Sequence, residues 1–197
     1  MIRTKAEWRR ALLTARAAIP EAARRHGSAV MLEYVQRLPC FETARSILGY
    51  VALGAEADPF SVLSSRVASG VPVFMPSSTS DGGPCWLAWN GRSAVEIGGG
   101  VLAARLEYPV LAIVPGVGFD VRGIRLGRGR GFYDRALAEL RGQGAVHAVG
   151  LAFECQIVRD LPSDVWDECV DFVASEKRIL AADTQTTRRE EGRARWS

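Results

Sequence analysis

The sequence contains few of the residues that build disulfide frameworks and zinc sites. Its 197 residues include only 4 cysteines and 2 histidines. Cys40, Cys85, Cys155 and Cys169 are far apart and form no CxxC pair, whereas structural zinc sites need closely spaced ligands. We therefore expect reduced thiols and no cysteine-bound metal.

Long hydrophobic runs and large blocks of one charge are also missing. No stretch approaches the roughly 20 apolar residues that span a bilayer, and no apolar segment follows the charged N-terminus as in a secretory signal. The net charge is only +3, and the basic residues do not form one block of the kind that binds nucleic acid. The sequence predicts a cytoplasmic protein with neither a membrane nor a nucleic acid as partner.

Length and composition fit a single folded domain. Hydrophobic residues make up 48% of the chain and charged residues 24%, which is close to the average of globular proteins. From Asp183 onward there is almost no apolar residue before Trp196, so burial would not offset the entropy of ordering this segment. We expect one domain over residues 1–180, a disordered tail over 181–197, and a monomer or weak dimer.

Alternating helical and strand patterns organise this domain. Near the N-terminus apolar residues recur at helical spacing, and Thr4 and Glu7 stand in capping-box register. Short β-branched and aromatic runs between turn residues have the pattern of buried strands. Predicted helices span residues 5–18, 20–38, 58–70 and 132–141, and predicted strands span 46–53, 71–75, 85–89, 110–114, 146–153 and 170–174. This order predicts an α/β fold, a three-layer single domain with a mainly parallel sheet flanked by helices.

The most informative segment is residues 114–135, which follow the predicted strand 110–114. Its centre reads Arg125-Leu126-Gly127-Arg128-Gly129-Arg130-Gly131 and continues into Phe132-Tyr133-Asp134-Arg135. Glycine at every second position lets backbone N–H groups approach an anion, and the arginines add charge-assisted donors. A helix beginning near Gly131 adds its positive dipole end. The segment therefore predicts a phosphate site.

Two well-known nucleotide-binding patterns do not describe this segment. It lacks the GxxxxGK[ST] pattern of the Walker loop, and its GxGxG spacing differs from the dinucleotide fingerprint. A structural turn between strand and helix is the alternative. Because turns need one or two glycines rather than three at alternate positions, an anion site of another lineage is favoured.

Pro115-Gly116 and the run from Arg125 to Arg135 resemble the signature of the 5-formyltetrahydrofolate cyclo-ligase family, also called methenyltetrahydrofolate synthetases. The resemblance extends from the Lys5-x-x-x-Arg9 start to residue 175. It implies ATP- and magnesium-dependent conversion of 5-formyltetrahydrofolate into 5,10-methenyltetrahydrofolate through a phosphorylated formyl intermediate, with release of ADP and phosphate. The implied partners are ATP and a folate, and the implied cofactor is Mg²⁺.

The resemblance also implies roles for individual residues. Arg128 and Tyr133 are the expected catalytic residues, and Asp134 and Asp167 the expected magnesium ligands. The expected ATP-binding residues are Lys5, Arg9, Arg125, Leu126, Gly127, Arg128, Gly129, Arg130, Gly131, Phe132 and Tyr133. The expected folate-binding residues are Val51, Glu56, Arg128, Gly129, Arg130, Gly131 and Phe132.

Several of these residues have a plainer structural explanation. Lys5, Arg9 and Arg16 would project from one helical face, which fits either phosphate contact or a solvated basic face. Glu56 follows a predicted strand, where it either accepts hydrogen bonds from a pterin ring or caps the helix that begins at Asp58-Pro59.

The same choice between a functional and a structural explanation exists in three other cases. Val51 either lines the folate pocket or packs in the core. Asp134 and Asp167 either hold Mg²⁺, which takes one or two carboxylates together with phosphate oxygens, or are surface acids. Trp86 and Trp89 either stack on a pterin ring or pack in the core.

Departures from the family pattern leave two other functions open. Arg130 stands where many relatives carry glycine or lysine, Trp166 where they often carry His or Asn, and Pro109-Val110 replaces a frequent Asp-Leu. With the loop at 77–90, these changes are compatible with a paralogue that keeps the ATP site but acts on another substrate. A non-catalytic nucleotide-binding regulator is the second alternative.

Overall fold

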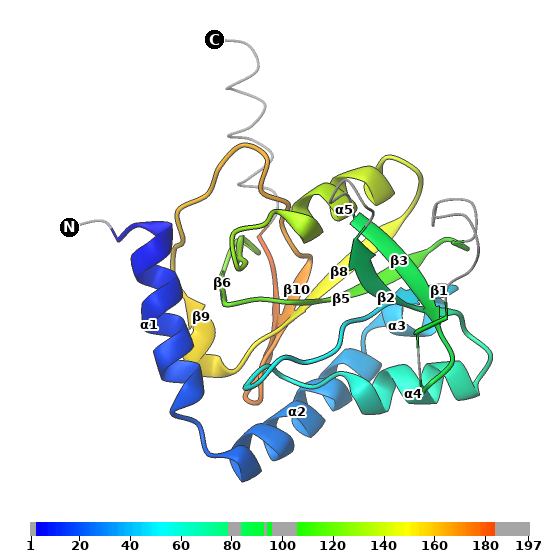
Figure 1. Ribbon diagram of the computed structural model, residues 1–197, viewed down its shortest axis with the longest axis horizontal. Coiled ribbons are helices and arrows are strands. Elements are labelled where there is room, and N and C mark those ends of the chain that lie inside the picture. The colour runs from blue at the N-terminus through cyan, green and yellow to red at the C-terminus, as the bar shows by residue number, and fades with distance from the viewer. Residues whose placement is uncertain (1–2, 79–83, 93, 96–105, 184–197) are drawn as a thin grey trace.

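A mixed β-sheet with helices on both faces forms the frame of the molecule (Figure 1). The computed structural model describes residues 3–78, 84–92, 94–95 and 106–183. The α-helices are α1 (Lys5–Ala17), α2 (Glu21–Gln36), α3 (Pro39–Thr43), α4 (Phe60–Ala68) and α5 (Phe132–Arg141), and η2 (Glu154–Gln156) is a 3-10 turn. The strands are β1 (Ser46–Leu48), β2 (Val73–Ser78), β3 (Pro84–Trp89), β4 (Ala94–Val95), β5 (Val110–Pro115), β6 (Gly118–Asp120), β7 (Arg125–Leu126), β8 (Val146–Leu151), β9 (Ile157–Val158), β10 (Phe172–Ala174) and β11 (Ile179–Ala181).

The main sheet has eight strands within the described residues, in the order β11-β10-β8-β5-β1-β2-β3-β4. Strands β10, β8, β5, β1 and β2 run parallel to one another. Antiparallel pairs occur at the two edges, where β11 joins β10 and where β3 and β4 follow β2. The predicted α/β fold with a mainly parallel sheet is confirmed.

The helices divide between the two faces of this sheet. On one face α2, α3 and α4 form a core that includes Met31, Leu63 and Ile113. On the other face α5 contributes Leu137, which packs in a second core with Leu48. The central strands are therefore covered on both sides, as their nearly continuous apolar sequences predict.

A second, three-stranded sheet in the order β7-β6-β9 was not predicted. Its strands have only two or three residues each, too few for a period-2 pattern to be recognised in the sequence. Helix α1 covers it through a third core in which Leu12 packs with Val117, Leu126 and Leu161. The small sheet thereby places the Arg125-Leu126 strand next to α1.

Several predicted boundaries were wrong. The strand predicted over 46–53 ends at Leu48, and a Cβ atom at Gly49 would lie 2.5 Å from Leu63 Cδ1. The chain leaves the sheet at this point, and Tyr50, Val51 and Leu53 instead line a cavity. The short helix α3 was not predicted, and β2 continues to Ser78 through part of the segment expected to be a loop.

The predicted domain boundary at residue 180 falls inside β11. The Ala182 N–H also donates to the Asp171 carbonyl at 2.9 Å, so ordered contacts continue to the end of the described residues. The remainder of the predicted tail, residues 184–197, lies outside the described residues, as does the part of the 77–90 loop at 79–83.

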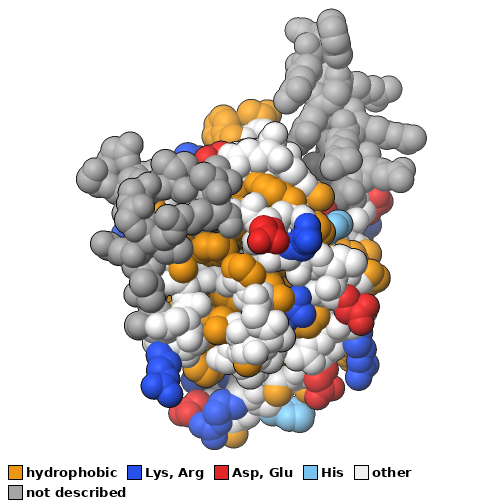
Figure 2. Space-filling view, turned by 90° about the vertical axis from the view of Figure 1, so that its right-hand side faces the viewer, with side chains coloured by type: hydrophobic (Ala, Val, Ile, Leu, Met, Phe, Trp, Pro, Cys, Tyr) orange, Lys and Arg blue, Asp and Glu red, His pale blue; other side chains and the backbone are white. Residues whose placement is uncertain are grey.

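The surface seen in Figure 2 carries charges of both signs. Acidic and basic side chains lie beside one another along the lower part of this face, and hydrophobic side chains are visible across its centre. None of the described helices combines the length and the apolar character needed to cross a bilayer.

Candidate active site

A cavity of about 750 Å³ lies beyond the carboxyl ends of β1, β2 and β5. This is the usual place for a ligand site in an α/β fold. Helix α1, the segment after β1, the loop between β7 and α5, and residues 164–167 complete its walls. The cavity is lined by Lys5, Arg9, Tyr50, Val51, Leu53, Glu56, Pro76, Ser77, Pro115, Gly116, Val117, Arg125, Leu126, Gly127, Arg128, Gly129, Arg130, Gly131, Phe132, Tyr133, Asp134, Asp164, Trp166 and Asp167. It therefore brings together every predicted site residue, although their individual roles stay predictions.

The glycine loop, residues 127–131, connects β7 to α5. Gly129 and Gly131 have φ angles of +98° and +61°, which side chains with a Cβ atom rarely adopt. Gly131 stands immediately before α5, so the predicted helix start is confirmed. A Cβ atom at Gly127 would lie 2.6 Å from Arg125 Nη1. The glycines therefore allow both the turns of the loop and its close approach to Arg125.

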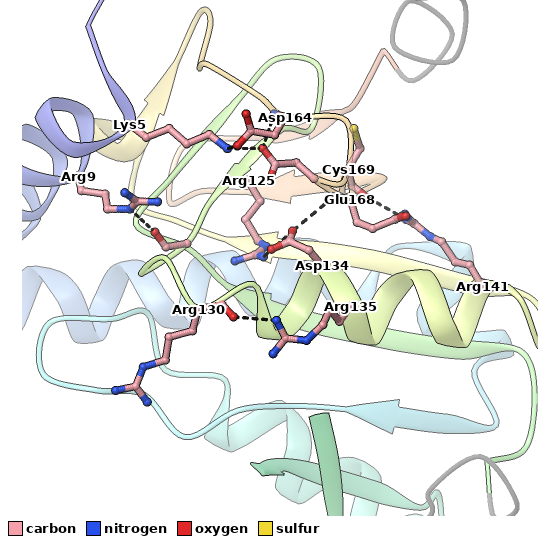
Figure 3. Close-up of polar contacts among 12 residues, drawn as sticks. Lys5, Arg9, Arg125, Arg130, Asp134, Arg135, Arg141, Asp164, Glu168 and Cys169 are labelled. Carbon is pink, nitrogen blue, oxygen red and sulfur yellow. Dashed lines mark hydrogen bonds and ion pairs between the residues drawn. The ribbon is translucent and has the colours of Figure 1, made fainter. Parts of the chain in front are cut away.

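Arg125 and Asp134 form a buried ion pair at the base of this loop (Figure 3). Arg125 Nη2 donates to both carboxylate oxygens of Asp134 at 2.9 Å. The guanidinium also lies 5.4 Å from the ring centroid of Tyr133, and its buried Nε has no hydrogen-bond partner among the described residues. Burial raises the pKa of Tyr133 well above its ordinary value, although the positive charge of Arg125 opposes that shift. Tyr133 thus remains a hydroxyl donor at neutral pH.

Two basic residues of α1 contact the other walls of the cavity. The predicted capping box, in which Thr4 and Glu7 bond reciprocally, is present and fixes where α1 begins. Lys5 Nζ lies 2.7 Å from Asp164 Oδ2 and 2.5 Å from Asp167 Oδ2, and Arg9 Nε donates to the Gly127 carbonyl at 2.8 Å. Figure 3 shows both side chains reaching across from the helix. The interpretation of Lys5 and Arg9 as a solvated basic face was therefore wrong.

The bonds to Asp164 and Asp167 also affect the charge of Lys5. Burial alone lowers the pKa of Lys5, but the hydrogen bonds and charges of the two carboxylates outweigh it, and the pKa is raised. Lys5 is therefore a fixed positive charge, balanced by the two acids.

Glu56 is a buried carboxylate with partners on both oxygens. Only 7% of its side chain is exposed. Oε1 accepts from Arg128 Nη2 at 2.8 Å, and Oε2 accepts from the Leu53 N–H at 3.0 Å. It does not cap α4, because Asp58 Oδ1 is the group that accepts from the Phe60 N–H. The capping alternative was therefore wrong.

The apolar residues considered for folate binding lie in two different places, the cavity lining and the core. Val51 is 68% exposed and lines the cavity, so the alternative of core packing was wrong. Trp86 and Trp89 are both buried, and neither is among the cavity-lining residues. Trp86 instead packs edge-on against Phe132, with ring centroids 5.7 Å apart. It therefore packs against the first turn of α5, directly after the glycine loop.

Sequence reasoning did not select several residues of the cavity. Leu53 and Trp166 are exposed apolar residues on its lining, and Asp164 shares Lys5 with Asp167. Asp164 lies three positions before Asp167, and the turn between them brings both carboxylates to the Lys5 amine. Nothing in the sequence distinguishes this pair from acids on the surface.

Residues 1–176 match the family described as the 5-formyltetrahydrofolate cyclo-ligase family. The chain belongs to this family. A 5-formyltetrahydrofolate cyclo-ligase from Mycolicibacterium smegmatis is 27% identical over 193 residues, covering 91% of this chain and 97% of that protein. The enzyme of the same name from Haemophilus influenzae is 46% identical over 57 residues, 29% of this chain and 30% of that protein. The predicted family and its class of enzyme, a ligase, are confirmed.

Solved structures of the family share the fold. The Aquifex aeolicus 5,10-methenyltetrahydrofolate synthetase superposes with a TM-score of 0.74 at 26% identity, over 91% of this chain and 93% of that one. A 5,10-methenyltetrahydrofolate synthetase from Mycoplasma pneumoniae gives a TM-score of 0.71 at 21% identity, over 87% and 98% of the two chains, a likeness of fold.

The positions that depart from the family pattern lie in different surroundings. Arg130 is exposed, and its side chain points away from the Arg125–Asp134 pair (Figure 3). Trp166 is 69% exposed at the cavity. Pro109 precedes β5 and is not among the cavity-lining residues. Of the three departures, Arg130 and Trp166 can therefore touch a ligand in the cavity.

The two predicted magnesium ligands fit a metal that arrives with a phosphate better than a resident one. No group of three or more His, Cys, Asp or Glu side chains suited to a metal occurs in the described part of the chain. Asp134 is bound by Arg125, and Asp167 accepts both from Lys5 and from the Asp164 N–H at 2.8 Å. Two carboxylates beside one cavity suffice for Mg²⁺ when phosphate oxygens and water supply the remaining ligands.

Proposed function

We propose that this chain converts 5-formyltetrahydrofolate into 5,10-methenyltetrahydrofolate at the expense of ATP. The single observation that carries this proposal is the cavity, which places cationic side chains, a glycine loop at a helix N-terminus and a buried carboxylate within one space. Cationic side chains and the N–H groups of a glycine loop at a helix N-terminus bind phosphate. A carboxylate accepts hydrogen bonds from the N–H donors of a pterin ring.

The reaction needs activation of a poor leaving group. The formyl oxygen attacks the γ-phosphorus of ATP, an O–P bond forms, and the bond to the ADP oxygen breaks. The neighbouring folate N–H nitrogen then attacks the activated carbon and gives up its proton, the C–O bond breaks, and phosphate leaves with the former formyl oxygen and takes up that proton. Both steps are favoured by positioning and by neutralising charge on phosphate.

Individual side chains take the following parts in this proposal. Arg128, whose side chain is 55% exposed, turns from Glu56 to the transferring phosphate and neutralises its charge. Tyr133 stays protonated and donates a hydrogen bond to a phosphate oxygen. Lys5, Arg9 and the N–H groups of the glycine loop hold the remaining phosphates.

Magnesium, when bound with ATP, supplies charge neutralisation at the phosphate oxygens. Asp134 and Asp167 are the residues that would hold it. Each carboxylate is paired with a cationic side chain of the chain itself, Lys5 or Arg125, which balances its charge.

The test is direct turnover. Purified protein is mixed with ATP, MgCl₂ and 5-formyltetrahydrofolate, and the near-ultraviolet absorbance of the methenyl product is followed, with reactions lacking ATP or folate as controls. We expect absorbance to rise only when all components are present. ATP binding without any absorbance change contradicts the proposal, and phosphate release with another amide in place of the folate identifies a paralogue.

A further inference from the structure

Arg16 is a third basic residue of α1, and it lies beneath the cavity rather than in its lining. Only 5% of its side chain is exposed. Arg16 Nη1 donates to the Gly116 carbonyl at 3.4 Å, and Nη2 lies 3.8 Å from Glu56 Oε1. Burial lowers the pKa of Arg16, and the Glu56 carboxylate opposes that shift. Because a guanidinium keeps its proton in proteins, this buried position holds a permanent positive charge.

Glu56 Oε1 thus faces two guanidinium groups with different freedom. Arg128 is closer, at 2.8 Å, but its side chain is more than half exposed and belongs to the glycine loop. Arg16 is farther away, but it is enclosed by protein and fixed to Gly116. The exposed partner is the one able to leave, and the buried partner is the one that stays.

We propose that Arg16 is the permanent counter-ion of Glu56, a positioning residue that holds this carboxylate in place for a pterin ring. The inference rests on the proposed function, in which Glu56 accepts hydrogen bonds from pterin N–H groups. Once Arg128 turns to the phosphate of ATP, Arg16 and the Leu53 N–H remain as the partners of the carboxylate.

The chemistry of a buried carboxylate gives this role its importance. A buried carboxylate that loses its positive neighbour is left with an uncompensated charge, and its side chain is then drawn toward water or toward another cation. A carboxylate that has moved no longer presents its oxygens to the N–H groups of a pterin. The neighbouring Tyr50 hydroxyl does not replace Arg16, because it donates to the Ala57 carbonyl at 2.5 Å.

The decisive comparison is between Arg16→Gln and Arg16→Lys. Glutamine keeps a donor for the Gly116 carbonyl and removes the charge, whereas lysine keeps the charge but on a shorter side chain that reaches less far toward Glu56. We expect Arg16→Gln to raise the KM for 5-formyltetrahydrofolate about tenfold, with kcat and the KM for ATP within about twofold, because only ground-state folate binding is lost. Arg16→Lys recovers most of that loss, to a rise of about threefold.

Two controls separate a counter-ion from a merely structural residue. Arg10→Gln removes an exposed arginine from the same helix and is expected to change neither KM. In a Glu56→Gln background, Arg16→Gln is expected to cause no further rise in the folate KM, because the charge it served is absent. Thermal unfolding of each variant checks that the fold is retained.

Several results would overturn the proposal. A folate KM in Arg16→Gln equal to that of Arg10→Gln, a lysine variant no better than glutamine, or a parallel rise in both KM values each shows that Arg16 does not act through Glu56. If Arg16→Gln does not fold, Arg16→Lys carries the test, and an unchanged folate KM contradicts the role. Absence of turnover by the unaltered chain instead contradicts the proposed function, and calorimetric titration of the variants with 5-formyltetrahydrofolate then decides on Arg16 separately.

Discussion

Arg128 Nη2 lies 2.8 Å from Glu56 Oε1, although 72 positions separate these residues in the chain. One of them is proposed to bind the phosphate of ATP and the other the pterin of the folate. A proposed phosphate-binding group and a proposed pterin-binding group are therefore paired with each other. Lys5 and Asp167 repeat the arrangement at 2.5 Å, with a proposed phosphate ligand bound to a proposed magnesium ligand.

Arg128→Ala should raise the KM for ATP. Hydrogen bonds to charged groups contribute about 1.5–3 kcal/mol, so the expected increase is roughly one to two powers of ten. Steady-state kinetics at saturating folate measures it. Arg135→Ala, an exposed arginine next to the same loop that donates to the Arg130 carbonyl, serves as the matched control. Equal KM values for ATP in the two variants would remove Arg128 from the phosphate site.

Asp167→Asn should raise the magnesium concentration needed for half-maximal activity, by about tenfold, because a neutral amide is a weaker ligand for this cation than a carboxylate. Asp164→Asn is the matched control, since Asp164 shares Lys5 with Asp167 at 2.7 Å but is not a proposed metal ligand. Activity is titrated with MgCl₂ at fixed ATP. An equal rise in the magnesium requirement of both variants would mean that Asp167 acts through its ion pair with Lys5 and does not bind magnesium.

Arg125→Met should destabilise the fold as well as the site. Both side chains of the Arg125–Asp134 pair are largely buried, and removing one partner of a buried pair leaves the other charge uncompensated, at a cost of about 3 kcal/mol. Urea unfolding of the variant measures the loss. Arg135→Met, at an exposed position, is expected to stay within about 0.5 kcal/mol of the unaltered chain. A similar small effect for both would show that Asp134 is solvated when alone.

The regular elements were largely predictable because their patterns are long. Helix α5 was predicted at its observed bounds, since the glycine before it and the apolar spacing within it agree. The strand after residue 46 was predicted too long, because Tyr50 and Val51 continue its apolar run while serving the cavity. Residues that line a cavity can share the composition of a strand.

Many of the residues that line the cavity were predictable through the glycine loop and the family pattern, but the contacts among them were not. Nothing in the sequence indicates that Arg128 meets Glu56 or that Arg16 lies behind both. These contacts depend on the three-residue and two-residue strands of the small sheet, which bring α1 beside the end of β5. Such short strands show too little sequence pattern to be predicted. The long-range contacts that depend on them therefore could not be predicted either.

Tyr133→Phe should make the stability of the fold decrease less steeply as the pH rises above 10. Burial raises the pKa of Tyr133 above the ordinary value of 10.0, so the folded state holds this proton more tightly than the unfolded chain. Below pH 10 both states are protonated and the group has no effect on the pH dependence. As pH rises above 10 only the unfolded chain ionises, and stability falls by up to about 1.4 kcal/mol per pH unit.

Thermal midpoints measured between about pH 9 and 11.5 test this sign. The phenylalanine variant has no proton to lose, so its midpoint should decline less steeply than that of the unaltered chain. Some slope remains in both, because burial and the charge of Glu56 also raise the pKa of Tyr50. Parallel curves for the two proteins would show that Tyr133 ionises in the folded state as readily as in the unfolded one, which would also remove it as a hydrogen-bond donor to phosphate at high pH.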